Sequence, residues 1–193
     1  MILTEQEILL SEKMEFQKST FELLKKGTDN PVTQYAFFND VNELVNFSEK
    51  AINSNINDGE NPIRNIQKWL IGKNEFAFIS KIKNDEPNQI TILKAKNQFD
   101  ILHFQKTDGG SYDISTTQII EKLTLWDKLF GVNIIGADNS WVLFEIKKMP
   151  KDINWLANEL YEFCPDILDQ NFGEIEKLVE HLKNTNEIQL WWD

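Results

Sequence analysis

The stretch that decides the fold is residues 115–146, STTQIIEKLTLWDKLFGVNIIGADNSWVLFEI. It predicts a helix capped by Ser115 and ended by Gly131, because apolar residues between these positions recur at helical spacing. Residues 132–136 and 140–146 are rich in β-branched and aromatic residues, and ADN before the second run is typical of a turn. So short a link joins antiparallel strands, so the stretch predicts an α+β fold.

The flanking sequence extends this prediction in both directions. Toward the C-terminus it predicts helices at 152–163 and 173–185 and a strand at 187–192. Toward the N-terminus it predicts a three-stranded meander at 75–82, 89–95 and 98–104. We therefore expect a mostly antiparallel sheet of about six strands packed with helices, and preceded by an N-terminal helical segment.

The N-terminal part predicts three helices. The first runs from a capping box at Thr4 and Glu7 to a stop at Gly27. The second covers residues 39–53, where apolar residues fall on one helical stripe, and the third covers 61–72, with Asn61 as its cap. We expect residues 1–72 to form a helical extension and residues 73–193 to form the α+β domain.

The charge restricts the classes of partner. The chain of 193 residues has 31 acidic and 20 basic residues and a net charge of −11. This argues against nucleic acid, which needs clustered Lys and Arg, and against a membrane surface of anionic lipid. Ten acidic and only three basic residues fall in 151–193. This acidic segment is either a solvated surface or a patch that steers a basic protein partner.

Long apolar runs and a basic leader are not features of this sequence. The longest apolar run is far too short for a membrane span, and MILTEQEILL lacks the start of a signal peptide. A cytoplasmic location is therefore expected. A single Cys excludes an internal disulfide and a zinc site with several thiolates from one chain. We expect no metal and no cofactor.

The lone Cys164 lies in YEFCPDILDQ, residues 161–170. A reactive thiol needs a lowered pKa. Cys164 falls at the predicted end of a helix, beside Glu162 and Asp166, where the local field disfavours a thiolate. The pattern favours a buried small residue over a nucleophile or a metal ligand.

Several polar residues are candidates for a binding site. Asp166 and Asp169 lie three residues apart and could cap a turn, hold a hard cation or act as an acid–base pair. The loop TDGGSYD lacks the Lys of a phosphate loop, so it favours a tight connection, with Tyr112 and Asp113 as residues of a pocket mouth. In the terminal LWWD, Trp191 and Trp192 would point to opposite faces of a strand, and at least one should be buried. The candidate binding residues are Tyr112, Asp113, Asp166, Asp169, Gln170, Trp191, Trp192 and Asp193.

Residues 97–193, with a weaker likeness back to Phe76, resemble a bacterial family known as domain of unknown function 4253. The resemblance rests on EKLTLWDKLFGVNIIGA, SWVLFEI, MPKDINWLANELYEFCPDILDQ and LWWD. This chain departs from the usual family pattern at Ser111 and at Asn171. The resemblance implies a common fold unit and a shared surface around Phe163 to Gln170, Tyr112, Asp113 and the C-terminus, and it implies no activity.

Three functions remain open from the sequence. The first is a non-enzymatic protein-binding module, such as an immunity protein that binds and blocks a basic toxin. The second is a small-ligand- or metal-binding protein or a hydrolase that uses Tyr112, Asp113, Asp166 and Asp169. The third is a structural subunit that assembles through exposed Trp residues. The sequence favours the first and leaves catalysis and the oligomeric state open.

Overall fold

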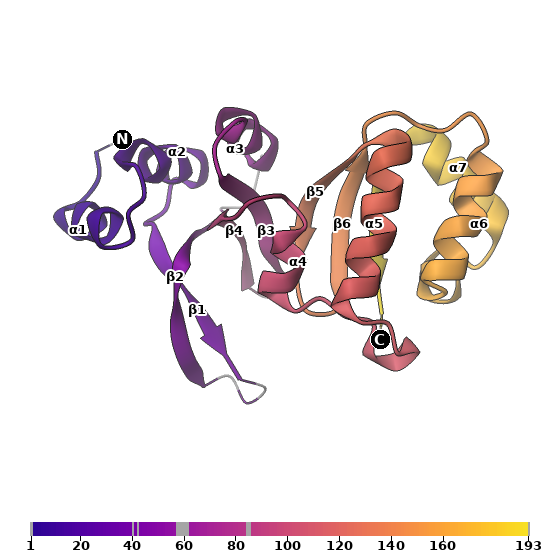
Figure 1. Ribbon diagram of the computed structural model, residues 1–193, viewed down its shortest axis with the longest axis horizontal. Helices are drawn as coiled ribbons and strands as arrows, with labels where there is room; N and C mark the ends of the chain where they lie inside the picture. Colours follow the sequence, from indigo (N-terminus) through magenta and orange to yellow (C-terminus); the bar gives the residue numbers. More distant parts are fainter. Residues whose placement is uncertain (1, 40, 42, 57–61, 84–85, 193) are drawn as a thin grey trace. The chain divides into compact units, whose positions relative to one another are not determined.

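A computed structural model describes residues 2–39, 41, 43–56, 62–83 and 86–192 (Figure 1). The chain divides into two compact units, Met1–Asn97 and Gln98–Asp193. The domain boundary that the sequence predicts at 72/73 stays a prediction. The two strands that follow Gly72 pair with each other, and the second of them also pairs with the strand Leu44–Asn55, so they group with residues before Gly72.

The N-terminal unit combines three helices with an antiparallel sheet. Its helices are α1 (Glu5–Lys13), α2 (Lys18–Thr28) and α3 (Ile63–Leu70). Its strands are β1 (Thr33–Phe38), β2 (Leu44–Asn55), β3 (Glu75–Lys83) and β4 (Glu86–Lys94), in the order β1-β2-β4-β3. Each of these pairings is antiparallel, so the predicted sheet type is confirmed for this unit.

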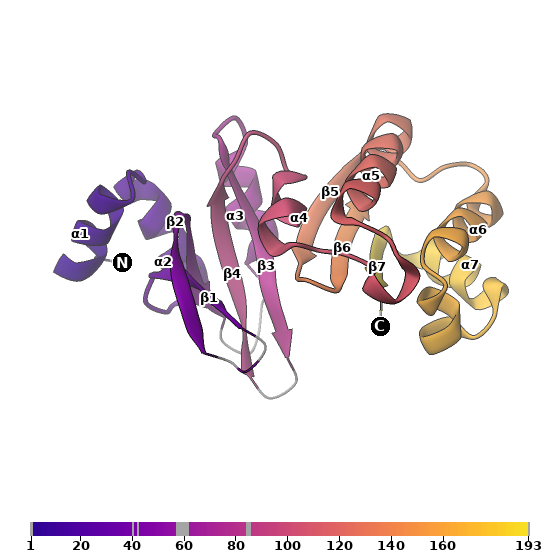
Figure 2. The same ribbon diagram turned by 60° about the horizontal axis from the view of Figure 1, so that its bottom comes forward.

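The C-terminal unit contains a three-stranded antiparallel sheet and its helices (Figure 2). Its strands, in sheet order, are β5 (Val132–Ala137), β6 (Trp141–Ile146) and β7 (Glu187–Trp191). Its helices are α4 (Asp100–Gln105), a 3-10 turn η1 (Gly110–Tyr112), α5 (Thr116–Phe130), α6 (Ile153–Phe163), a π-helix η2 (Ile167–Phe172) and α7 (Ile175–Asn184). The α+β class is therefore confirmed.

The deciding stretch folds as predicted. Ser115 caps α5 with a reciprocal capping box to Gln118, and Gly131 ends the helix with a φ of 75°. Ile119, Leu123 and Trp126 are fully buried along one side of α5, which packs on β5. The hairpin of β5 and β6 follows directly, and it is the centre of the C-terminal unit.

The helix predicted at 39–53 is wrong. Most of that range belongs to β2, which pairs antiparallel with β1 and also with β4 from Ala51 to Asn55. Val41, Leu44 and Val45 of the predicted helical stripe are each more than half exposed. Ala51 and Ile52, its other two members, are fully buried. The stripe is therefore exposed at one end and buried at the other, and pairing along both edges of β2 decides the conformation instead.

The strand predicted at 98–104 is also wrong, because α4 occupies Asp100–Gln105. Ile101, Leu102, Phe104 and Gln105 are buried, a spacing that fits one face of a short helix. A short apolar run cannot by itself distinguish a strand from a buried helical segment.

The first predicted helix is interrupted. The capping box of Thr4 and Glu7 is confirmed, but the chain leaves the helix after Lys13 and Glu15 adopts a φ of 56°. Gly27 does not stop α2, which continues to Thr28. A Cβ at Gly27 would lie 2.9 Å from Ile66 Cδ1, so this glycine permits the close approach of α2 and α3. Asn61, the predicted cap of the third helix, lies outside the described residues.

Candidate functional site

The stretch YEFCPDILDQ forms the end of α6 and the start of η2. Asp152 begins α6 by accepting a hydrogen bond from the backbone N–H of Trp155, at 2.9 Å. The helix ends at Cys164, and after Pro165 the chain turns into the π-helix, which ends at Gly173 with a φ of 71°. π-Helical turns are rare and are frequent at functional sites, so the geometry here is unusual for a plain connection.

Cys164 is held as a buried thiol. It is fully buried, and its Sγ donates a hydrogen bond to the backbone carbonyl of Trp191 at 3.0 Å. Burial, with a smaller contribution from the charge of Asp166, raises the pKa of the thiol to about 11. The predicted direction is confirmed, although burial outweighs the neighbouring charge as its cause. A thiol that stays protonated at neutral pH is a poor nucleophile.

Asp166 and Tyr112 form the closest contact among the candidate residues. The Tyr112 hydroxyl donates to Asp166 Oδ1 at 2.7 Å, and Asp166 is only 4% exposed. This hydrogen bond, followed by burial and the charges of Asp166 and Asp169, raises the pKa of Tyr112 to about 12. Asp166 occupies the N-cap position of η2 without making a side-chain cap, so the capping role predicted for it is wrong. Its carboxylate fastens the 3-10 turn to η2 instead.

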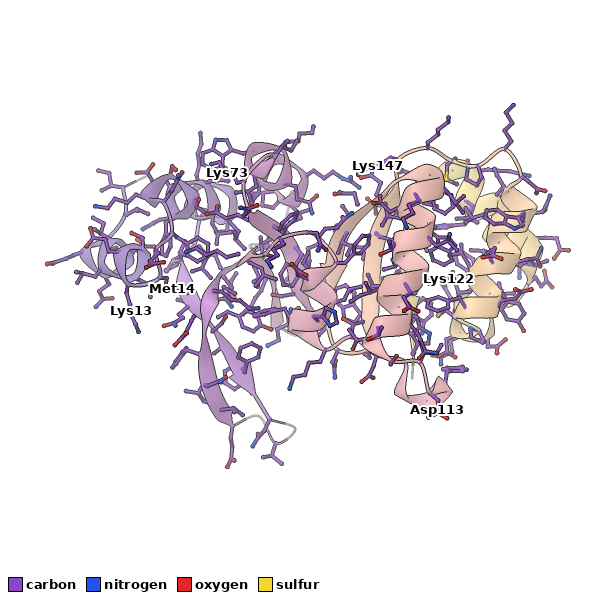
Figure 3. All side chains as sticks on the ribbon, in the orientation of Figure 1. Lys13, Met14, Lys73, Asp113, Lys122 and Lys147 are labelled. Carbon is purple, nitrogen blue, oxygen red and sulfur yellow. The ribbon has the colours of Figure 1, made fainter. Side chains whose placement is uncertain are left out.

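Asp113, Asp169 and Gln170 are all exposed. Asp113 follows the 3-10 turn with a φ of 54° and lies at the outer end of that turn (Figure 3). The charge of Asp169 acts on Tyr112, and Gln170 Oε1 accepts the indole N–H of Trp191 at 3.4 Å. The structure thus brings Tyr112, Asp166 and Asp169 into one region and leaves Asp113 at its edge. A binding role for these residues stays a prediction.

The terminal tryptophans have different environments. Trp192 is buried, and its indole N–H donates to the carbonyl of Phe163 at 3.4 Å. Its ring meets the Phe163 ring edge-on, with 5.8 Å between centroids. Trp191 is half-buried at the end of β7. The prediction that at least one of the two is buried is confirmed, and Asp193 lies outside the described residues.

The glycine-rich loop closes on itself. Gly109 and Ile114 exchange both backbone hydrogen bonds, at 2.7 and 3.1 Å, and the N–H of Tyr112 donates back to Gly109. Loop N–H groups that are used internally do not cradle a phosphate, and the tight connection is the better description. A Cβ at Gly109 would lie 3.0 Å from Trp192 Cγ, a close approach that the sequence analysis missed.

The described part of the chain contains neither a metal-binding cluster nor a membrane-spanning helix. Within the described ranges, no three His, Cys, Asp or Glu side chains lie together in an arrangement that could hold a metal ion. Among the same residues, no helix is long and apolar enough to cross a membrane.

Comparison with known proteins identifies the family. The model of the family described as Domain of unknown function (DUF4253) matches residues 89–193, more than half of the chain. The chain belongs to the DUF4253 family. The match begins within β4, inside the stretch of weaker likeness that reaches back to Phe76. No curated protein and no solved structure gave a significant match.

The C-terminal unit, which holds most of the DUF4253 match, carries most of the negative charge. Gln98–Asp193 contains 17 acidic and 8 basic residues, a net of −9. The outer side of α6 adds two aromatic rings to this charge, since Trp155 is 40% exposed and Tyr161 38% exposed. The sequence analysis missed this face, although the helical spacing opposite the buried positions carries the signal. The exposed residues are Asn154, Trp155, Asn158, Tyr161 and Glu162.

Contacts with α5 hold the inner side of α6 in place. Lys122 reaches from α5 to Glu159 of α6, with 2.7 Å between Nζ and Oε2 (Figure 3). Its ammonium group also lies 5.3 Å from the ring centroid of the buried Trp126. Phe163 meets Trp126 edge-on at 5.8 Å, so the end of α6 is packed into the core. A fixed helix that presents aromatic and acidic side chains is well suited to recognition.

Proposed function

We propose that this DUF4253 protein is a non-enzymatic binding module that recognises a basic protein, in the manner of an immunity protein that blocks a toxin. The observation that carries the proposal is the outer face of α6, where Trp155 and Tyr161 are partly exposed beside Glu162 in a unit of net charge −9. Tyr and Trp are enriched among the residues that dominate binding energy, and an acidic surround speeds the approach of a basic partner.

The roles of the candidate reactive residues also support the proposal. Cys164 is a buried hydrogen-bond donor with a raised pKa, and Asp166 is a buried acceptor for Tyr112. Both side chains hold local structure together around η2. These positions serve a rigid scaffold, and a rigid scaffold lowers the entropic cost of binding a partner.

The test begins with the tagged full-length protein as bait in its native host at low ionic strength. We expect it to retain a basic protein whose purified form binds with a nanomolar dissociation constant that rises steeply with salt. The captured protein should arrest growth when expressed alone, and co-expression should restore growth. A captured partner without such toxicity would contradict the blocking role, and no partner would contradict the proposal as a whole.

A matched pair of tryptophans assigns the binding face. Trp155 in the C-terminal unit and Trp69 in the N-terminal unit are 40% and 41% exposed. Trp155→Ala should weaken binding by about 10-fold or more, as is common for a central aromatic residue. Trp69→Ala should leave the dissociation constant unchanged. Equal losses from the two substitutions would contradict the assignment to α6.

A further inference from the structure

The C-terminal unit contains a hollow beside β7 to which no function has yet been assigned. Its volume is about 380 Å³, within the range of small-ligand sites. Side chains of η2, α7 and β7 line it, together with Leu143 of β6. The π-helix that follows Cys164 therefore forms one wall of the hollow, and its unusual geometry shapes that wall.

Two aromatic side chains on the wall are held in place. Phe172, from the last turn of η2, lies against the imidazole of His181 with 5.0 Å between ring centroids. Trp191, from β7, donates its indole N–H to Gln170 Oε1 at 3.4 Å. Both rings line the hollow, and both are oriented by residues from neighbouring elements. A ring held in this way offers a ready surface for a cation.

The polar groups of the wall favour the same kind of ligand. Among the described residues that line the hollow, Glu187 is the one carboxylate, and none is a Lys or an Arg. The side-chain amides of Asn171, Asn184 and Gln189 supply further oxygen acceptors. A group with several N–H donors and a positive charge could be attracted by the carboxylate and donate to these oxygens, whereas an anion would be repelled by the carboxylate.

We propose that this hollow receives the guanidinium group of an arginine side chain from a basic protein partner. A guanidinium is planar, so it can lie against Phe172 or Trp191, and its N–H groups can reach Glu187 and the amide oxygens at once. An ammonium group has no such plane, which is why arginine fits this wall better than lysine. The proposal rests on the proposed function, because it names the part of the partner that this unit recognises.

The test uses the intact protein and two small probes of nearly the same shape. N-acetyl-arginine methylamide carries the guanidinium group, and N-acetyl-citrulline methylamide replaces it with a neutral urea. Heteronuclear NMR follows the Trp191 indole N–H and the backbone amides of Phe172 and Gln189. We expect saturable shifts of these three signals with the arginine probe and at least a fivefold weaker response with the citrulline probe. Equal responses, or shifts spread over the acidic surface, would overturn the proposal.

Two substitutions locate the effect within the hollow. Glu187→Gln removes the charge and keeps the shape, and it should raise the dissociation constant of the arginine probe about fivefold. Glu174→Gln makes the same charge change at a carboxylate whose side chain is 65% exposed and does not line the hollow, so it should change nothing. Phe172→Leu tests the ring separately. Equal effects of the two Glu→Gln changes would show general attraction to an acidic surface and overturn the site.

Binding of the arginine probe and binding of a protein partner test the arginine site and the proposed function separately. If a purified basic partner binds equally well to the native protein and to the Glu187→Gln and Phe172→Leu variants, the proposed function stands and the arginine site is overturned. If the arginine probe binds in the hollow and no protein partner is found, the hollow is supported as a guanidinium site and the proposed function fails. Unchanged melting temperatures of the variants are the control for folding.

Discussion

Two carboxylates, one in each unit, are buried to the same extent but are stabilised in different ways. Glu7 and Asp166 are both 4% exposed. Glu7 accepts from Lys25 at 2.6 Å and from the backbone N–H groups of Thr4 and Val32, at 2.7 and 3.1 Å. Asp166 accepts from the neutral hydroxyl of Tyr112. Burial of a carboxylate therefore does not by itself mark a functional site, because the hydrogen-bond donors around the carboxylate decide its role.

The two carboxylates also differ in which elements they join. Burial opposes the ionisation of Glu7, yet the hydrogen bonds from Lys25, Thr4 and Val32 outweigh it and lower the pKa to about 2. Glu7 therefore ties the start of α1 to α2 and to the chain before β1, and it is fully committed to structure. Asp166 fastens the 3-10 turn η1 to η2 through a neutral donor.

The largest effect should come from removing the charge of Glu7. Glu7→Gln should lower the free energy of unfolding at neutral pH by about 3 kcal/mol, because it leaves Lys25 and two backbone donors with a neutral partner. Urea unfolding followed by circular dichroism measures this loss. Glu12→Gln is the matched control, because the ion pair of Glu12 with Lys18 has both side chains more than half exposed and should contribute little.

The pH dependence of stability tests the role of Glu7 independently. The pKa of Glu7 falls from 4.5 to about 2 on folding, so its stabilising contribution is complete above about pH 5. It is lost as the pH falls toward 2. The native protein should therefore lose stability across this range more steeply than the Glu7→Gln variant. Parallel profiles for the two proteins would contradict the role assigned to Glu7.

The next largest effect should come from a substitution at Gly109, which packs closely against Trp192. Gly109→Ala places a Cβ 3.0 Å from Trp192 Cγ and 3.1 Å from Ile114 Cβ, and should cost about 2 kcal/mol of stability. At Gly110 the nearest atom would be Asp108 Oδ1 at 3.6 Å, so Gly110→Ala should be nearly neutral. The melting temperatures of the two variants make the comparison. Similar values would show that the loop moves away from Trp192 at little cost.

The sequence predicted the C-terminal unit better than the N-terminal unit for a physical reason. From Ser115 to Trp191 most elements have local signals, such as the capping box of α5, Gly131 at its end and Asp152 before α6. In β2, Leu44 and Val45 are exposed whereas Ala51 and Ile52 are buried, so the spacing of these apolar residues did not report one buried helical face. Pairing with β1 and β4 fixes that strand, and such pairing between distant segments is not written in any one window of sequence.

The candidate site shows the same limit. The sequence singled out Tyr112, Asp166 and Asp169, and the structure brings these three into one region. It did not predict the π-helix or the hollow beside β7, since both depend on how η2 packs against α7 and β7. Trp155 and Tyr161 were within reach, because the helix prediction for 152–163 already placed them opposite the buried residues of α6.

A smaller effect should come from the hydroxyl that contacts Asp166. Tyr112→Phe removes the 2.7 Å hydrogen bond and should cost about 1 kcal/mol, because the buried carboxylate loses a donor. Tyr161→Phe is the matched control at nearly the same exposure, 38% against 37%, and should change the stability by less than about 0.3 kcal/mol. If both substitutions have equal effects, Asp166 does not depend on Tyr112, and the contrast with Glu7 is lost.

The smallest effect should be seen at Cys164, where the expected result is an absence of reaction. Its thiol is fully buried and its pKa is raised to about 11, so both access and the thiolate fraction are low at neutral pH. Alkylation by iodoacetamide, followed by mass spectrometry, should proceed only as fast as the protein opens and should accelerate sharply in denaturing urea. Glu7→Gln, which lowers stability without touching the C-terminal unit, should speed alkylation only if opening of the whole chain exposes the thiol. Rapid alkylation of the native protein would instead show an ionised, accessible sulfur, and Cys164 would then belong with functional residues and not with the scaffold that Glu7 typifies.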